Sequence, residues 1–281
     1  MTTALVNRIL PFSSVDGPGN RTAIFLQGCN FNCLYCHNPE TISICKSCGR
    51  CVDVCPTGAL SIVDSLVTYN PDKCVFCDMC FRSCPYSSSA RVREMSAQDV
   101  MREVRKNIPF IRGITVSGGE CTLWHDFLLE LLGLAKSERL GTLLDSNGTY
   151  DYASDSALMA VTDGVMLDVK AWDKEEHMRV TGHENVMVQR NLCWLAENGK
   201  LTEVRTVIVP NLFDVEKTVR ETAKTVCECG SGDKTRYKII RYRPMGVRKA
   251  NAEVLLAPDT ELLNTLATLA RDIGVRDVVV T

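Results

Sequence analysis

GCNFNCLYCHNPE, residues 28–40, places three cysteines, Cys29, Cys33 and Cys36, in a C-x3-C-x2-C array. Gly, Asn and Pro interrupt any regular structure here, so we expect a loop. A cubic iron–sulfur cluster takes four ligands, which leaves one ligand missing. Disulfide pairing would leave one of the three thiols over. The array therefore raises the question of whether a fourth ligand comes from elsewhere in the chain or from a group that is not protein.

The composition is that of an ordinary globular protein. The chain has 281 residues, 45% hydrophobic and 23% charged, which suffices for a large core of one or two domains. A formal net charge of -2 argues against nucleic acid as a partner, because nucleic-acid-binding domains usually carry a basic surface. The chain shows neither a leader-like start nor a run of 18 or more apolar residues. We therefore expect a cytoplasmic protein with no membrane contact.

The fifteen cysteines are crowded into one part of the chain. Eleven of them lie between Cys29 and Cys84. In a reducing cytosol, clustered cysteines indicate metal ligation or redox chemistry rather than disulfides. The other four carry no cluster spacing, and we expect them to be buried or free thiols. They are Cys121, Cys193, Cys227 and Cys229.

A repeat inside the crowded segment has ferredoxin spacing. CKSCGRCVDVCP at 45–56 and CVFCDMCFRSCP at 74–85 share the pattern C-x2-C-x2-C-x3-C-P. In bacterial two-cluster ferredoxins the fourth cysteine of each run ligates the other cluster. On that rule one [4Fe-4S] cluster takes Cys45, Cys48, Cys51 and Cys84, and the other takes Cys74, Cys77, Cys80 and Cys55. The alternative is a pair of zinc knuckles, which C-x2-C pairs also suit.

Outside this segment, strand patterns alternate with helix patterns. Short apolar runs ended by Gly, Asp or Pro predict strands at 21–28, 113–119, 141–148, 163–170, 202–210 and 237–244. Helices are predicted at 96–106, 124–138, 154–159, 186–198, 215–226 and 259–271. Such alternation predicts an α/β fold with a parallel sheet. Because six units are too few for an eight-fold barrel, we expect a partial (β/α)6 TIM-type barrel made of residues 1–37 and 91–281. A ferredoxin-like domain with two [4Fe-4S] clusters is expected as an insertion at residues 38–90.

Polar motifs follow five of the predicted strands. The cysteine loop, SGGE at 117–120, DSNG at 145–148, DVK at 168–170 and RPMG at 243–246 all lie at strand carboxyl ends. In parallel α/β folds the active site lies at this edge of the sheet. The motifs therefore predict one common site.

Together these motifs resemble the radical S-adenosylmethionine (SAM) superfamily. In that family three cysteines bind three irons of a [4Fe-4S] cube, and the amino and carboxylate groups of SAM chelate the fourth. The resemblance thus implies that the missing ligand is SAM itself. It also implies that the reduced cluster donates one electron to the sulfonium and that a 5′-deoxyadenosyl radical forms, with the protein orienting the cofactor.

The resemblance assigns roles residue by residue. Cys29, Cys33, Cys36 and Lys170 are the implied catalytic residues, with Lys170 supplying positive charge for the methionine carboxylate. The implied SAM contacts are Tyr35, Cys36 and His37 at the adenine, Gly118, Gly119 and Glu120 at the methionyl amino group, Asp145 and Lys170 at the ribose or methionyl end, and Asp168, Val169, Arg205 and Arg243 as further contacts. A monovalent cation between Asp145 and Asp168 is also implied.

A narrower resemblance is to the activating enzymes of glycyl-radical enzymes, and it spans essentially the whole chain. It is carried by SSVDGPGNRTAIFLQGCNFNCLYCHNPE at 13–40, LDSNGT at 144–149, MLDVK at 166–170 and VIVP at 207–210. It implies that the radical removes a hydrogen atom from one glycine of a partner glycyl-radical enzyme. It further implies that Asp16 helps to hold the glycine loop, and that reduced flavodoxin or ferredoxin supplies the electron.

Two positions depart from the family pattern. Cys121 stands where Pro often follows GGE, and Arg243 stands where a His is common, although Arg can donate hydrogen bonds but not accept them. Three other kinds of function stay open beside the activase. The first is a radical SAM enzyme acting on another substrate, and the second is a polyferredoxin electron carrier without catalysis. A carrier would leave the C-x3-C-x2-C, SGGE and DVK motifs unexplained, and a zinc-binding interaction protein is a third alternative.

Overall fold

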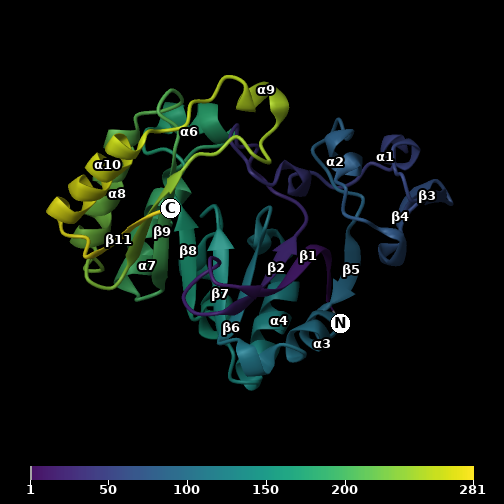
Figure 1. The fold of residues 1–281 in the computed structure, drawn as a ribbon. Helices are drawn as coiled ribbons and strands as arrows, with labels where there is room; N and C mark the ends of the chain where they lie inside the picture. The colour runs from purple at the N-terminus through teal and green to yellow at the C-terminus, as the bar shows by residue number, and fades with distance from the viewer. Residues whose placement is uncertain (1) are drawn as a thin grey trace.

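The computed structural model describes residues 2–281, which are built around a nine-stranded, mainly parallel sheet (Figure 1). The strand order is β11-β10-β9-β8-β7-β6-β2-β1-β5. All neighbours from β2 to β11 pair in parallel. The bounds are β2 (Arg21–Leu26), β6 (Gly113–Gly118), β7 (Gly141–Ser146), β8 (Gly164–Asp168), β9 (Leu201–Ile208), β10 (Arg236–Arg241) and β11 (Asp277–Val280). The predicted parallel α/β sheet is confirmed, because β2 and β6 to β10 are the six predicted strands.

Three strands of this sheet were not predicted. β1 (Thr3–Ser13) pairs antiparallel with β2, β5 (Arg93–Ser96) pairs antiparallel with β1, and β11 extends the opposite edge. β1 and β5 mix polar with apolar residues and are only partly buried, so they lack a continuous apolar run. The expectation of six strands was therefore incomplete at both edges of the sheet.

Helices form a layer outside the sheet (Figure 1). The predicted helices correspond to α3 (Ala97–Arg105), α4 (His125–Ser137), α5 (Ser156–Val161), α7 (Val186–Glu197), α8 (Val215–Glu228) and α10 (Thr260–Ile273). Side chains of Ser96, Asp214 and Asp259 cap the first turns of α3, α8 and α10 by accepting backbone N–H bonds. Sequence reasoning missed the short polar α6 (Lys174–Thr181) and α9 (Lys249–Ala252). Among residues 2–281, no helix has the length and apolarity needed to cross a membrane.

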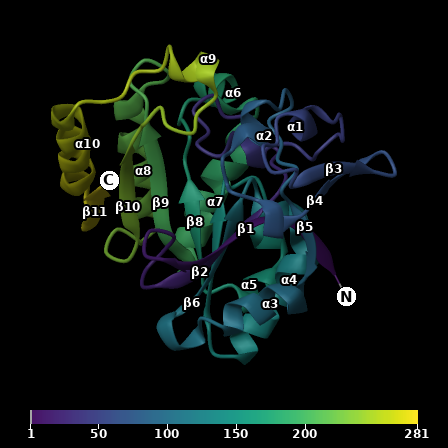
Figure 2. The same ribbon diagram turned by 45° about the vertical axis from the view of Figure 1, so that its right-hand side comes forward.

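Residues 38–90 lie beside the sheet rather than in it. They contain the short helices α1 (Arg50–Asp53) and α2 (Met79–Arg82) and the hairpin β3 (Leu60–Val63) and β4 (Leu66–Tyr69). Asp64 and Ser65 turn the hairpin with positive φ angles of 49° and 65°, as a two-residue primed turn requires. Figure 2 shows this hairpin projecting away from the sheet.

The loop that leads into β2 covers part of the face of the sheet that carries Leu143 and Met166, which we call the inner face. A Cβ on Gly17 would meet the side chains of Leu143 on β7 and Met166 on β8. Beside it, the buried Arg21 donates to the carbonyls of Ile114 and Gly141 at 2.7 and 2.8 Å, and burial lowers the pKa of Arg21 to about 10. The loop is therefore held against strands that end at the predicted site.

Helix α4 provides a test of the core. Leu131 is fully buried on α4. We expect Leu131→Ala to lower the free energy of unfolding by about 2–5 kcal/mol, since the substitution leaves a cavity. The control Leu123→Ala, at a side chain that is 52% exposed, should change it by less than about 0.5 kcal/mol. Anaerobic urea unfolding measures both, and equal losses in the two variants would contradict this packing.

Candidate active site

The cysteine loop opens into a cavity of about 240 Å³ at the carboxyl ends of the parallel strands. Its backbone is fixed by bonds from Gly28 N to Thr41 O and from Cys29 N to Ile42 O, at 2.8 and 2.9 Å. The predicted residues that line the cavity are Cys29, Cys33, Tyr35, Cys36, His37, Gly118, Gly119, Asp145, Asp168, Lys170 and Arg205. Most of the predicted site residues are therefore brought together.

Four of the residues predicted to contact SAM or the glycine loop are not among those that line this cavity. Val169 is buried in the core, and the Arg243 side chain is exposed. The backbone carbonyl of Arg243 instead lies 2.9 Å from His37 Nε2. Asp16 accepts a 2.5 Å hydrogen bond from Ser13 Oγ in the loop on the inner face of the sheet.

Glu120, the fourth of these residues, joins two loops of the site. Its carboxylate is fully buried and accepts hydrogen bonds from Asn147 N at 2.7 Å, Ser146 Oγ at 2.9 Å and Thr122 Oγ1 at 2.7 Å. Burial raises the pKa of Glu120, and these donors oppose the rise. The side chain thus ties the loop after β6 to the loop after β7.

Opposite charges are paired on the floor of the cavity. Lys170 Nζ lies 2.7 Å from Asp168 Oδ2, and Arg205 Nη1 lies 2.9 Å from Asp145 Oδ1. Arg205 also pairs with the buried Glu203. Burial by itself would lower the pKa of Lys170 and of Arg205, but the neighbouring carboxylates raise both above their ordinary values. Both side chains therefore stay cationic, and the cavity presents both signs of charge to a ligand.

The three thiols are suited to bind iron. Burial raises the pKa of Cys29 to about 12 and that of Cys33 to about 11, so iron would have to displace their protons on binding. Thiolates are the usual ligands of iron–sulfur clusters. The buried Tyr35 hydroxyl has no hydrogen-bond partner among residues 2–281. Three ligands from one loop and an unpartnered polar atom fit a cluster with one open position beside a polar ligand.

The connection after β10 clamps the cysteine loop, which sequence reasoning missed. Arg248 Nη2 donates to the carbonyl of Cys33 at 2.7 Å, and Asn251 Nδ2 donates to that of Leu34 at 2.6 Å. Both residues lie beyond the RPMG motif, and their contacts span more than 200 residues of chain. No local pattern in the sequence predicts such a contact.

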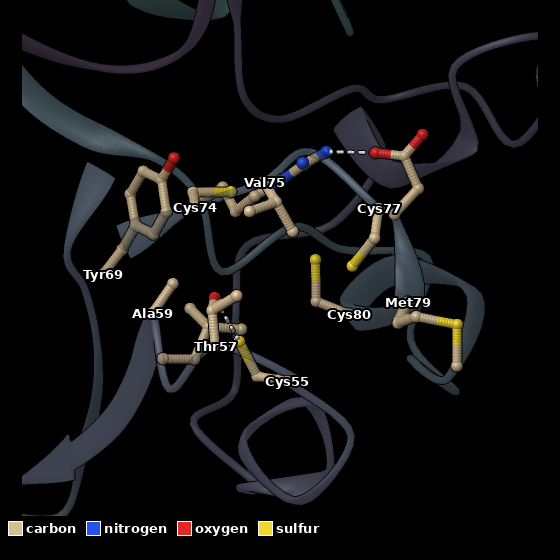
Figure 3. Close-up of a pocket in the computed structure, with 12 residues that line it drawn as sticks. Cys55, Thr57, Ala59, Tyr69, Cys74, Val75, Cys77, Met79 and Cys80 are labelled. Carbon is tan, nitrogen blue, oxygen red and sulfur yellow. Dashed lines mark hydrogen bonds and ion pairs between the residues drawn. The ribbon is translucent and has the colours of Figure 1, made fainter. Parts of the chain in front are cut away.

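Two further cavities are lined by cysteines of residues 38–90. Figure 3 shows the first, in which the thiols of Cys55, Cys74, Cys77 and Cys80 gather. The second is lined by Cys45, Cys48, Cys51 and Cys84, with Cys80 also at its wall. In both, three cysteines come from one C-x2-C-x2-C run and the fourth comes from the other run. We refer to them as the Cys55 cavity and the Cys45 cavity.

The spacing of these thiols differs from that of a single zinc ion. Tetrahedral zinc with Zn–S bonds of about 2.3 Å holds its sulfurs roughly 3.8 Å apart. Within residues 2–281, only Cys193, Glu197 and Cys229 form a group of three ligand atoms that all lie within 4.8 Å of one another. No three of the eight thiols of the two cavities therefore lie within 4.8 Å of one another, as the ligands of a zinc knuckle would.

The expectation that Cys193 and Cys229 are buried or free thiols was wrong. Cys193 on α7 and Cys229 at the end of α8 form a disulfide, with Cα atoms 5.6 Å apart. The two helices pack side by side, which brings together residues 36 positions apart in sequence. Cys121 is a buried free thiol that donates to the carbonyl of Asp145 at 3.5 Å. It thus links the loop after β6 to β7.

Residues 23–224 match the family model of the Radical SAM superfamily, so the fold is that of a radical SAM protein. The chain is 33% identical to the pyruvate formate-lyase-activating enzyme of Streptococcus mutans over 87% of its length and 79% of that protein. It is 30% identical to the (2S)-3-sulfopropanediol sulfolyase activating enzyme of Bilophila wadsworthia, over 88% and 87%. The crystal structure of QueE from Escherichia coli shares the fold, with a TM-score of 0.54 and 13% identity over 99% of this chain and 94% of that one.

The chain belongs to the glycyl-radical enzyme activating enzymes of the radical SAM superfamily. It is therefore an enzyme that carries out radical chemistry. Membership implies a [4Fe-4S] cluster and SAM as cofactors.

The close approach of Gly119 to the cysteine loop generates a prediction. A Cβ on Gly119 would lie 2.1 Å from the carbonyl oxygen of Gly28, whereas one on Gly133 meets nothing within 4 Å. We expect Gly119→Ala to displace the cysteine loop and slow SAM cleavage about 100-fold, the usual cost of misplacing reacting groups. Gly133→Ala should leave the rate unchanged. Formation of 5′-deoxyadenosine in anaerobically reconstituted protein measures both, and equal rates in the two variants would refute the packing argument.

Proposed function

We propose that this chain cleaves SAM reductively and removes a hydrogen atom from one glycine of a partner glycyl-radical enzyme in the cytoplasm. The observation that supports this most directly is the main cavity, in which three thiols from one loop face the paired charges of Lys170 and Arg205. SAM carries an amino group and a carboxylate at its methionyl end. A cavity floor with both signs of charge suits such a ligand.

In this proposal Cys29, Cys33 and Cys36 would hold three irons of the cluster and leave the fourth iron open to SAM. When bound, the reduced cluster and SAM together supply the 5′-deoxyadenosyl radical that removes the hydrogen atom. The chain's own task is to bind and orient SAM and the cluster, and to exclude water from the cavity.

The SAM contacts are proposed from the walls of the cavity. Lys170 meets the methionine carboxylate, and the unpartnered hydroxyl of Tyr35 marks the adenine end together with His37. Backbone at Gly118 and Gly119 approaches the amino group. The monovalent cation between Asp145 and Asp168 would share both carboxylates with existing partners, because Arg205 and Lys170 already pair with them.

Asp16 is proposed to hold the glycine loop of the partner. Its loop lies on the inner face of the sheet, against Leu143 and Met166. Both side chains belong to strands that end at the cavity, β7 and β8. A glycine target suits a confined site beside this loop, because glycine has no Cβ and tolerates conformations that other residues avoid.

We further propose that residues 38–90 form a ferredoxin-like domain inserted between residues 1–37 and 91–281. It would hold two [4Fe-4S] clusters, one in the Cys45 cavity and one in the Cys55 cavity. The support is the exchange of the fourth cysteine between the two runs and the wide spacing of the thiols. These clusters would pass electrons from reduced flavodoxin or ferredoxin to the radical SAM cluster.

SAM cleavage tests the proposed activity. Wild-type protein and Cys33→Ala are reconstituted anaerobically with iron and sulfide, then given dithionite and SAM. We expect 5′-deoxyadenosine from the wild type and none from Cys33→Ala, since the proposed cluster loses one of its three cysteine ligands. Cys227→Ala, at a free thiol outside the cavity, is the matched control and should retain cleavage. Full cluster loading without cleavage in any of the three proteins would overturn the activase and favour an electron carrier.

Replacement of cysteines in the insertion tests the proposed relay. We expect Cys48→Ala and Cys77→Ala to block turnover driven by reduced flavodoxin, because each removes a ligand of one proposed cluster. Turnover driven by dithionite should survive in part, since a small reductant reaches the radical SAM cluster directly. If flavodoxin-driven turnover is unchanged in both variants, the relay is wrong.

A further inference from the structure

The two cysteine cavities of residues 38–90 have unequal charge around them. Arg91 lines the Cys55 cavity, and its side chain is only 17% exposed. The Cys45 cavity has Lys46 and Arg50 at its wall, and both are exposed. A charge in contact with water is strongly screened, whereas a buried or partly buried one is screened much less. The cation beside the Cys55 cavity therefore has the stronger local effect.

Arg91 is held in place from three sides. Its Nη2 lies 2.9 Å from Asp78 Oδ1, and its guanidinium carbon lies 5.7 and 5.3 Å from the ring centres of Phe76 and Phe81. Its Nη1 is buried without a hydrogen-bond partner within residues 2–281. Because Arg91 lines this cavity beside its cysteines, the N–H is available to an acceptor bound there, such as a sulfur of a cluster.

We propose that Arg91 raises the reduction potential of the [4Fe-4S] cluster held by Cys55, Cys74, Cys77 and Cys80 above that of the other inserted cluster. This inference rests on the proposed two-cluster domain. Reduction adds one electron to the cluster and takes it from a flavin or iron–sulfur donor protein, with no bond made or broken. The added negative charge is stabilised by a nearby cation and by hydrogen bonds to sulfur, both of which raise the potential.

Asp78 has the opposite effect to Arg91 on the reduction potential of a cluster in the Cys55 cavity, because its carboxylate is negative. Its carboxylate also lies at the wall of the Cys55 cavity, and it is 39% exposed against 17% for Arg91. The carboxylate is therefore more strongly screened by water than the guanidinium. The net effect of the pair is positive, and the two side chains offer changes of opposite sign at one cluster.

The test is a potentiometric titration of the complete reconstituted protein, followed by electron paramagnetic resonance with and without SAM. The signal that SAM alters belongs to the radical SAM cluster, which leaves the two inserted clusters to be compared. We expect Arg91→Gln to reduce the equilibrium constant for reduction of the higher-potential inserted cluster about tenfold, which is about 59 mV for one electron. Asp78→Asn should raise the same reduction potential. Arg91→Lys should lower it much less than Arg91→Gln does, because the positive charge remains. Arg50→Gln, the matched control at the Cys45 cavity, should leave the higher potential unchanged.

Iron and sulfide analysis distinguishes failure of the proposed two-cluster domain from failure of the proposed role of Arg91. Iron and sulfide for one cluster only would mean that the insertion holds none, and the proposed two-cluster domain would be wrong. With three clusters loaded, unchanged potentials in Arg91→Gln and Asp78→Asn would overturn the role of Arg91. Should Arg91→Gln fail to load, Asp78→Asn decides alone, because its more exposed carboxylate can be neutralised while the Arg91 side chain remains. A rise in the higher potential supports the proposal, and no rise refutes it.

Discussion

The parallel pairing of β2 with β6 is the constraint on which the active site depends. Leu26 is aligned with Gly118, and the chain continues as a ladder, with Gly119 N bonded to Leu26 O and Glu120 N bonded to Gly28 O. This approach is possible only without side chains, since a Cβ on Gly118 would lie 2.2 Å from the backbone of Leu26. The cysteine loop and the SGGE loop are therefore positioned as one unit.

Buried and part-buried hydrogen bonds connect this pair of loops to the other loops of the site. Glu120 accepts from the loop after β7, and within that loop Asn147 Nδ2 returns to Asn30 Oδ1 in the cysteine loop at 2.8 Å. Arg248 and Asn251 hold the same loop from the far side. The carboxylate of Glu120 is fully buried, so losing one of its donors costs more than the bond itself contributes. The network keeps the three thiols in place before iron arrives.

The sequence predicted the centre of this arrangement better than its edges. Strands buried on both faces appear as largely apolar runs, so β2 and β6 to β9 could be found, whereas the half-buried β10 was found from its short apolar centre. β1 and β5 alternate or mix polarity, and no run distinguishes them. Most of the predicted residues that line the cavity belong to motifs at strand ends, whereas Arg205 lies within β9, and Phe31, Val207 and Ile240 line the cavity without having been predicted. Arg248, Asn251 and the Cys193–Cys229 disulfide depend on contacts across long stretches of chain, which no local pattern encodes.

The insertion differs from the sheet in what can stabilise it. Its buried cluster consists of Cys51, Leu60 and Cys80, with a few half-buried side chains around it. A segment of this length with so little apolar core has too small a hydrophobic contribution to fold without help, and metal ligation is the usual supplement. Two of those three residues are cysteines that line the proposed cluster cavities. The groups proposed to carry electrons would then also stabilise the segment that holds them, so that loss of the clusters and loss of its fold would be coupled.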